Sequence, residues 1–215
     1  MKPKIILLDP SAAGETDRLA CFCARVTQRT IGPMDSEAIV KLFYKPVSKD
    51  LVHNLIESDH NQCFRMNMIP IVVVGASRRF IAQITRHHVG TGFMATSLQY
   101  CAWADPNFYG DEDDDVRTMY QTQLENYRKM LSYGSDVAGY FIPEGVQGSI
   151  VISATPWEWR HIIQLRTCNR NTPETKYIIE ECKRILEPYS EVFRTGPACT
   201  RGGCKEANPC QEGKK

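Results

Sequence analysis

The sequence lacks any long apolar run and any strong charge imbalance. No apolar stretch approaches the roughly 20 residues that a membrane-spanning helix needs. The 26 Lys and Arg residues are matched by 25 Asp and Glu residues, which gives a formal net charge of +1. No global field therefore favours nucleic acid or an anionic membrane surface, and an anionic ligand has to be held by local arginines. The apolar stretch at residues 5–8 is too short for a secretory signal, so we expect a cytoplasmic protein that binds neither nucleic acid nor membrane.

Several motifs of known binding sites are also missing. The chain has no GxGxxG and no GxxxxGK[ST], so a Rossmann or P-loop nucleotide site is unsupported. Its nine cysteines are an odd number without a secretory segment, which argues against a disulfide framework. Cys199, Cys204 and Cys210 lie close together near the end, but their spacing is not the CxxC pairing of structural zinc sites. We therefore expect no metal site, and keep one at these cysteines only as an alternative.

The elements that can be predicted form a mixed set. Strands are expected over residues 4–8 and 66–74, with a strand and turn over 140–152, and Pro70 predicts an edge position or a bulge for the second strand. Capping residues and apolar periodicity predict helices over residues 17–29, 36–43, 48–58, 78–88, 116–130, 155–166 and 172–187. Because strands and helices do not alternate regularly, we expect an α+β fold with an antiparallel or mixed sheet flanked by helices. One domain is predicted over residues 1–192, followed by a Cys- and Gly-rich tail over 193–215.

Two of the predicted helices carry polar residues where a core helix would carry apolar ones. The first, capped by Ser77, offers Gln83, Arg86 and His87, with His88 next to them. The second has a proline at its first position and offers the polar side chains Arg160, His161, Gln164, Arg166 and, just beyond it, Arg170. Guanidinium groups suit phosphate or carbonyl oxygens, and imidazoles bond to or stack on flat rings. The pattern indicates a phosphorylated planar ligand; surface charge and hydrogen-bonded core histidines are the alternative.

An acidic run over residues 111–115 has two interpretations. It could hold a divalent cation, or it could open a helix, where negative charge suits the positive end of the helix dipole. We favour the helix start.

The two polar segments resemble motifs of one family. Gln83-x-x-Arg86-His87-His88, followed by Ser97-x-Gln99-Tyr100, is similar to the RHR…S motif of the flavin-dependent thymidylate synthases of the ThyX type. The residues around Arg166 resemble that family's WRHFxxLRT helix: Trp159-Arg160-His161 and Leu165-Arg166-Thr167. The ending Gly196-Pro197-x-Cys199 is similar to the tail of some bacterial and phage members.

This resemblance implies a ThyX-like fold and a concrete reaction. Members are homotetramers with active sites at subunit interfaces, and they bind FAD without a Rossmann fold. They transfer a one-carbon unit from methylenetetrahydrofolate to C5 of dUMP, using flavin reduced by NADPH, and release dTMP. The expected location is the cytoplasm, or the host cytoplasm if the gene is phage-encoded.

The motif match also implies a role for each polar residue. Arg166 would be the catalytic residue that holds the pyrimidine carbonyl edge and stabilises charge developing on the ring. The residues expected on FAD are Arg86, His87, His88, His161 and Arg170. The residues expected on the nucleotide, besides Arg166, are Gln83, Ser97, Gln99 and Tyr100.

Departures from the family pattern leave alternatives open. Gln99 and Gly139 stand where the family has arginines that hold phosphate, and each lost contact is worth about 1.5–3 kcal/mol. The Asn-Glu pair is replaced within Phe93-Met94-Ala95, and Met66 stands at the position of an upstream flavin histidine. Arg65, Arg78 or Arg79 would have to compensate for the missing arginines. A pyrimidine hydroxymethylase, an enzyme for another pyrimidine nucleotide, and a non-catalytic flavin- or nucleotide-binding paralogue are the alternatives.

Overall fold

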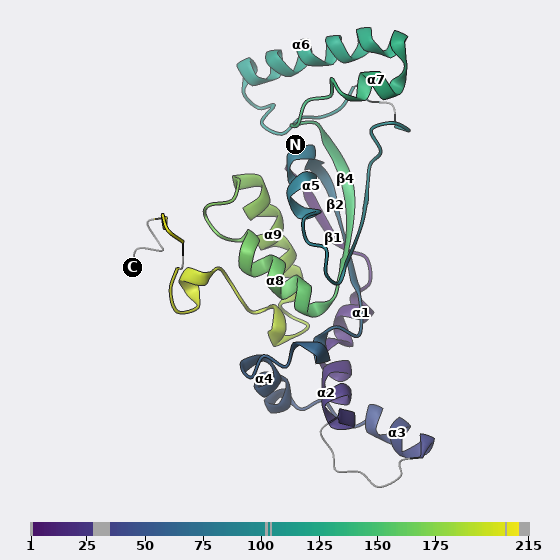
Figure 1. Ribbon diagram of the computed structural model, residues 1–215, viewed down its shortest axis with the longest axis vertical. Helices are drawn as coiled ribbons and strands as arrows, with labels where there is room; N and C mark the ends of the chain where they lie inside the picture. The colour runs from purple at the N-terminus through teal and green to yellow at the C-terminus, as the bar shows by residue number, and fades with distance from the viewer. Residues whose placement is uncertain (1, 28–34, 102, 104, 205, 211–215) are drawn as a thin grey trace. The chain divides into compact units, whose positions relative to one another are not determined.

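The computed structural model describes residues 2–27, 35–101, 103, 105–204 and 206–210 (Figure 1). Contacts within the chain divide it into two compact units. Of the described residues, the first unit holds 2–6, 71–88 and 92–152, and the second holds 7–70, 89–91 and 153–210. The domain boundary expected at residue 192 stays a prediction.

A four-stranded sheet supports the first unit. Its strands are β1 (Lys4–Leu7), β2 (Ile69–Ser77), β3 (Thr91–Ala95) and β4 (Gln147–Ala154), and they lie in the order β1-β2-β4-β3. The predicted α+β class is confirmed. The edge position expected from Pro70 is wrong, because β2 lies between β1 and β4. Pro70 is only the second residue of β2, where a missing N–H interrupts the ladder least, and its carbonyl accepts a 3.0 Å hydrogen bond from Leu8 N.

The polar helix that follows β2 is shorter than predicted. Helix α5 (Arg78–Ile84) begins directly after β2, and Ser77 Oγ caps it by accepting from Phe80 N at 3.1 Å. The expected continuation through His88 is wrong: the helix ends at Ile84. Thr85 Oγ1 bonds back to the carbonyl of Ile81 at 2.9 Å, and His87 N donates to the carbonyl of Ile84 in a tight turn. A β-branched residue that bonds locally is a poor residue for extending a helix.

A helical hairpin completes the first unit. It comprises α6 (Asp114–Met130), a 3₁₀ turn (Leu131–Tyr133) and α7 (Ser135–Gly139), with α6 and α7 side by side (Figure 1). The acidic run opens α6 as predicted: Asp113 Oδ1 accepts from the N–H groups of Asp115 and Val116, each at 3.0 Å. Gly134, with φ of +112°, ends the 3₁₀ turn. Sequence reasoning missed α7 and β3.

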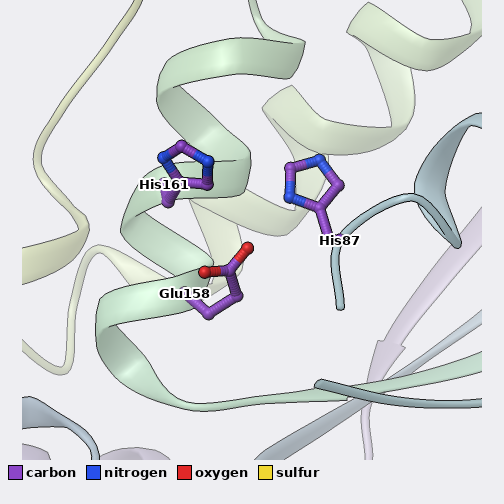
Figure 2. A group of neighbouring side chains, drawn as sticks. All are labelled: His87, Glu158 and His161. Carbon is purple, nitrogen blue, oxygen red and sulfur yellow. The ribbon is translucent and has the colours of Figure 1, made fainter. Parts of the chain in front are cut away.

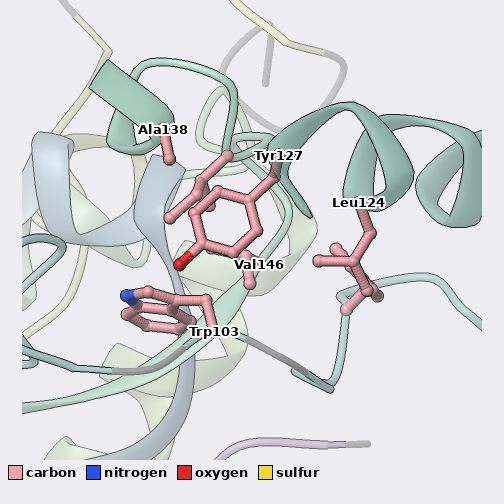
Figure 3. Close-up of a cluster of buried hydrophobic side chains, with 7 residues drawn as sticks. Trp103, Leu124, Tyr127, Ala138 and Val146 are labelled. Atoms are coloured by element: carbon pink, nitrogen blue, oxygen red, sulfur yellow. The ribbon is translucent and has the colours of Figure 1, made fainter. Parts of the chain in front are cut away.

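An apolar cluster joins this hairpin to the end of the sheet (Figure 3). Leu124 and Tyr127 of α6, Ala138 of α7, Trp103 and Val146 belong to it, and all five are buried. The indole N–H of Trp103 is not left unpaired, because it donates to the carbonyl of Ser97 at 3.2 Å. Fully burying a side chain such as Leu124 stabilises the fold by about 1.5–3 kcal/mol, so the cluster stabilises the packing of the hairpin.

The second unit is helical. Its α-helices are α1 (Pro10–Gly14), α2 (Thr16–Thr27), α3 (Ser36–Phe43), α4 (Lys49–Glu57), α8 (Pro156–Arg166) and α9 (Pro173–Leu186). Three 3₁₀ turns accompany them at Asn61–Phe64, Glu191–Phe193 and Ala198–Thr200. The predicted loop-like tail is confirmed, since beyond Phe193 the described residues form only the last of these turns. The predicted end of the first long helix at Arg29 lies outside the described residues.

Capping residues fix the starts of the helices that were predicted from them. Ser48, Thr155 and Thr172 each accept a hydrogen bond from the N–H three residues later, at 3.2–3.3 Å. The N–H of Thr155 itself donates to the carbonyl of Gly90 at 2.9 Å. Among the described residues, no helix has both the length and the apolar character that a membrane crossing requires.

Candidate functional site

Helix α8 is held by one apolar face and presents polar groups on the others. Trp159, Ile162 and Ile163 are fully buried, and the Trp159 indole N–H donates to the carbonyl of Ile69 at 2.9 Å. Arg160 donates to the carbonyl of Val192 at 2.9 Å, and its guanidinium lies 5.6 Å from the ring centroid of Trp157. Burial, reinforced by nearby Arg201, lowers the pKa of Arg160. The guanidinium of Arg160 is therefore held in place by the protein.

Glu158 and His161 project from α8 within the same turn (Figure 2). Glu158 is buried and His161 is exposed, and a carboxylate oxygen of the first lies within 4.8 Å of a ring nitrogen of the second. The family resemblance assigned His161 to the flavin and gave Glu158 no role. A buried carboxylate next to an exposed imidazole can fix the orientation of that ring.

The predicted catalytic residue lies at the end of α8. Arg166 Nη1 donates to Asn171 Oδ1 at 3.4 Å, and the amide of Asn171 donates to the carbonyls of Leu165 and Cys168 at 2.8 and 3.2 Å. The connection between α8 and α9 is thus held rigid beside the guanidinium. Arg170, in the same connection, forms an ion pair with Glu206.

Arg166 and Arg170 share a cavity in the second unit. The cavity has a volume of about 350 Å³, and Gln164 and Glu206 also line it. The structure therefore brings together two arginines that the sequence assigned separately to base and flavin. The same cavity contains cysteine side chains that the sequence did not connect with it.

The residues of the first polar segment lie at the end of α5 and beyond it. Gln83 is on α5 and half-buried, whereas Arg86 and His88 follow the helix and are exposed. His87 is 6% exposed and lies in the turn after α5 (Figure 2). Arg86 and His88 are thus free of the core and accessible, while His87 is part of the packed turn.

A hydroxyl-capped turn forms the predicted nucleotide segment. Ser97 Oγ accepts from the N–H groups of Gln99 and Tyr100, at 3.1 and 3.0 Å. The hydroxyl of Ser97 therefore shapes the turn in this structure. Gln99 is exposed, and Tyr100 is 86% exposed.

Gln99 and Gly139 line one cavity, of about 550 Å³, in the first unit. These are the two positions where the sequence departs from the expected arginines. A side chain at Gly139 would find room, because an added Cβ would meet its nearest neighbour, the carbonyl oxygen of Leu98, at 3.9 Å. Gly139 also has no positive φ that would demand glycine.

Arg78 supplies the positive charge of this cavity. Of the three arginines considered as substitutes, Arg78 lines it and Arg65 and Arg79 do not, among the residues that the structure describes. Arg78 Nη1 donates to the carbonyl of Ile142 at 3.1 Å, and its Nη2 lies 4.0 Å from a carboxylate oxygen of Glu144. With Asp136 also on the lining, one guanidinium faces two carboxylates. The cavity is therefore less positive than it would be with arginines at positions 99 and 139.

Comparison with known proteins agrees with the motif resemblance. The sequence profile of the family described as "Thymidylate synthase complementing protein" matches residues 10–190. A flavin-dependent thymidylate synthase from Sulfurisphaera tokodaii is 28% identical over 142 residues, which cover 59% of this chain and 54% of that relative. The match thus spans about half the length of that enzyme.

A solved structure shares the fold. The crystal structure of the UMP/dUMP methylase PolB from Streptomyces cacaoi, bound with 5-Br dUMP, superposes with a TM-score of 0.68 and 18% identity, covering 89% of this chain and 93% of that one. The predicted ThyX-like fold is confirmed. With a family profile that matches most of its length, this chain belongs to the thymidylate synthase complementing protein family.

Proposed function

We propose that this chain is a flavin-dependent methyltransferase that converts dUMP to dTMP. The carbon donor is methylenetetrahydrofolate, the reductant is NADPH and the cofactor is FAD, in a homotetramer whose active sites are completed by neighbouring subunits. Family membership supports the reaction class. The observation that carries the substrate assignment is the cavity shared by Gln99, Gly139 and Arg78. Two positions far apart in the sequence meet around one cavity, as positions that serve one ligand group should.

The accessible donors of the chain fit FAD. Arg86 and His88 are exposed beyond α5, and Arg170 lies on a cavity. Guanidinium groups match a pyrophosphate and imidazoles match a flat ring system. We propose Arg86, His88, His161 and Arg170 for direct contact with the cofactor, and His87, which is buried, for positioning the turn that carries Arg86 and His88. When bound, FAD supplies the hydride, and the protein supplies binding, orientation and electrostatics.

Arg166 is the residue we propose for catalysis. A guanidinium at the carbonyl edge of the pyrimidine stabilises negative charge as it develops on the ring, and it remains charged at any working pH. The bond to Asn171 holds the guanidinium in place before the substrate arrives. Such preorganisation avoids a reorganisation cost during the reaction. Gln83, Ser97, Gln99 and Tyr100 would contact the rest of the nucleotide.

A second candidate function differs in substrate or product. The cavity around Gln99 offers one arginine, Arg78, against Asp136 and Glu144, so it is a weak phosphate site. The departure from the family pattern at positions 99 and 139 leaves two alternatives on the same scaffold: an enzyme that accepts another pyrimidine nucleotide, and a hydroxymethylase in which water replaces hydride at the methylene.

One assay separates these functions. The purified protein, loaded with FAD, is incubated with methylenetetrahydrofolate, NADPH and each of dUMP, UMP and dCMP, and the products are identified by mass. A methyl group on dUMP supports the first proposal, and a hydroxymethyl group, or a product from dCMP alone, supports the second. A protein that binds no flavin and yields no product refutes both.

A further inference from the structure

Four cysteines line the cavity that contains Arg166. The tail provides Cys199, Cys204 and Cys210, and the connection between α8 and α9 provides Cys168. All four are half-buried and none is in a disulfide. The sequence suggested only the three tail residues, because nothing in the spacing relates Cys168 to them. Folding adds the fourth thiol that a tetrahedral site needs.

We propose that Cys168, Cys199, Cys204 and Cys210 form a thiolate site for Zn²⁺ that fastens the C-terminal tail beside Arg166. Zinc is the divalent ion most often held by four cysteines, at sulfur–zinc distances of about 2.3 Å. Binding releases the four thiol protons and leaves a complex of two net negative charges. No electron is transferred. Because Arg166 and Arg170 also line this cavity, zinc content and the cobalt spectrum, which do not depend on activity, distinguish this proposal from the proposed function.

The backbone on both sides of the cavity holds these cysteines at fixed places. Cys168 lies in the turn whose carbonyl accepts from Asn171 N and Nδ2, at 3.0 and 3.2 Å. Cys199 and Cys204 lie on either side of a turn in which Gly203 N donates to the carbonyl of Ala198 at 3.2 Å. Gly202 and Gly203, with φ of +107° and +126°, allow the chain to reverse there.

The charges around the cavity suit an anionic complex. Arg166 and Arg170 line it together with a single carboxylate, that of Glu206. The lining thus carries one net positive charge, which partly offsets the two negative charges of a zinc tetrathiolate. Guanidinium groups near such a site also donate hydrogen bonds to the sulfurs, which stabilises the thiolate form.

Apolar packing does not hold the tail in place. Between Gly196 and Cys210 the described residues are exposed or half-buried apart from Gly196 itself. So little burial does not offset the conformational entropy that is lost when a segment becomes ordered. That loss costs about 1–2 kcal/mol per residue for the backbone. Structural zinc commonly supplies that difference in small or irregular segments.

Metal binding must draw the sulfurs together. In the part of the chain that the structure describes, no three of these cysteine sulfurs already lie within 4.8 Å of one another. The cavity that these cysteines line has a volume of about 350 Å³, which exceeds the space that one metal ion needs. We therefore expect a more compact tail in the zinc form than in the zinc-free form.

The test begins with the full chain, purified under reducing conditions and passed over a desalting column. Elemental analysis should find about one Zn²⁺ per chain. After zinc is removed with a chelator, added Co²⁺ should give the near-ultraviolet thiolate-to-cobalt bands and visible bands of a tetrahedral site. Trypsin should cut after exposed Arg201 more slowly when Zn²⁺ is restored. This comparison uses one unaltered protein, so it does not depend on whether a variant folds.

Matched variants identify the ligands. Cys168→Ser and Cys204→Ser should each lower zinc content and change the cobalt spectrum, whereas Cys101→Ser should change neither, because Cys101 is exposed and does not line the cavity. Absence of bound zinc, or spectra unaffected by the first two variants, overturns the proposal. So does an iron–sulfur chromophore, or the loss of four titratable thiols to two disulfides under these conditions.

Discussion

Gln99 and Gly139 line the same cavity, although the whole of α6 lies between them in the sequence. Each stands where a phosphate-binding arginine was expected. Their meeting supports the correspondence on which that expectation rested, and it identifies Arg78 as the remaining cation of the cavity. It also defines the first prediction.

Restoring both arginines should strengthen dUMP binding. Each charge-assisted contact is worth about 1.5–3 kcal/mol, so Gln99→Arg with Gly139→Arg should lower the KM or Kd for dUMP by at least about tenfold. Deoxyuridine, which has no phosphate, should gain nothing. Tyr133→Arg is the matched control, because it adds the same charge at an exposed residue that does not line the cavity. Equal gains for dUMP in the control and the double variant would show that the two positions do not face phosphate.

Removing the cavity's own arginine should have the opposite effect. Arg78→Ala removes the guanidinium that is anchored on the carbonyl of Ile142, so we expect the Kd for dUMP to rise by about tenfold or more. Arg79→Ala is the control, since Arg79 is also on α5 but exposed and outside the cavity. Titration by calorimetry measures both. An unchanged Kd in Arg78→Ala would assign the phosphate to another place.

Loss of Arg166 should reduce catalysis more than stability. If its guanidinium stabilises charge in the transition state, Arg166→Ala should lower kcat by about 10²–10³-fold, as removal of a preorganised donor does elsewhere. Arg166 is half-buried at the end of α8, so the melting temperature is measured beside kcat to separate lost catalysis from lost folding. Arg184→Ala, at an exposed arginine paired with Glu181, is the control for lost charge. A fall in stability that accounts for the lost rate would contradict a catalytic role.

The contact between Gly90 and Thr155 predicts a coupled pair of stability changes. Thr155→Ala removes the cap of α8 and should cost about 1 kcal/mol. Gly90→Ala should cost more, because φ is +69° and the new Cβ would lie 3.0 Å from Thr155 Oγ1. In the double variant that crowding is relieved, so urea unfolding should give a total below the sum of the two. Simple additivity would show that backbone strain alone acts at Gly90.

The ion pair between His53 and Glu191 predicts a pH-dependent contribution to stability. His53 Nδ1 lies 2.8 Å from Glu191 Oε1, and the hydrogen bond to Glu191 raises the pKa of His53 above its ordinary value of 6.5. The contribution is therefore complete below pH 6.5 and disappears as the pH rises through the folded-state pKa. Thermal unfolding of the wild type and His53→Gln should differ at acidic pH and converge at alkaline pH. A difference that grows with pH would contradict this.

Local patterns predicted the helix starts well, because a cap is a short-range interaction. Four helices begin after a residue whose hydroxyl accepts a hydrogen bond from the N–H three residues later: Ser48, Ser77, Thr155 and Thr172. The end of α5 was missed because it depends on how Thr85 bonds, and polar periodicity continues past it. Pro70 was misread because an internal strand tolerates proline at its beginning, which only the pairing of β2 with β1 reveals.

The residues of the candidate site stay a prediction, and their grouping could not be predicted from the sequence. The resemblance identified Arg166, Gln99 and Gly139 from the sequence, yet only the fold shows which of them share a cavity. Cys168 could not be connected with the tail cysteines, since the whole of α9 separates them along the chain. Contacts between residues distant in sequence are set by packing, which local patterns do not encode.

Strand β2 runs directly into α5, which limits how the cavity lined by Arg78 can change among related sequences. Ser77 ends the strand and caps the helix, and the N–H groups of Arg78 and Arg79 donate to the carbonyls of Val146 and Glu144, each at 3.1 Å. No linker is present to absorb an inserted or deleted residue, and a one-residue shift would turn Arg78 away from its cavity. Length variation among relatives should therefore accumulate around Gly134, between α6 and α7, while the Arg78 side of the cavity changes by substitution alone.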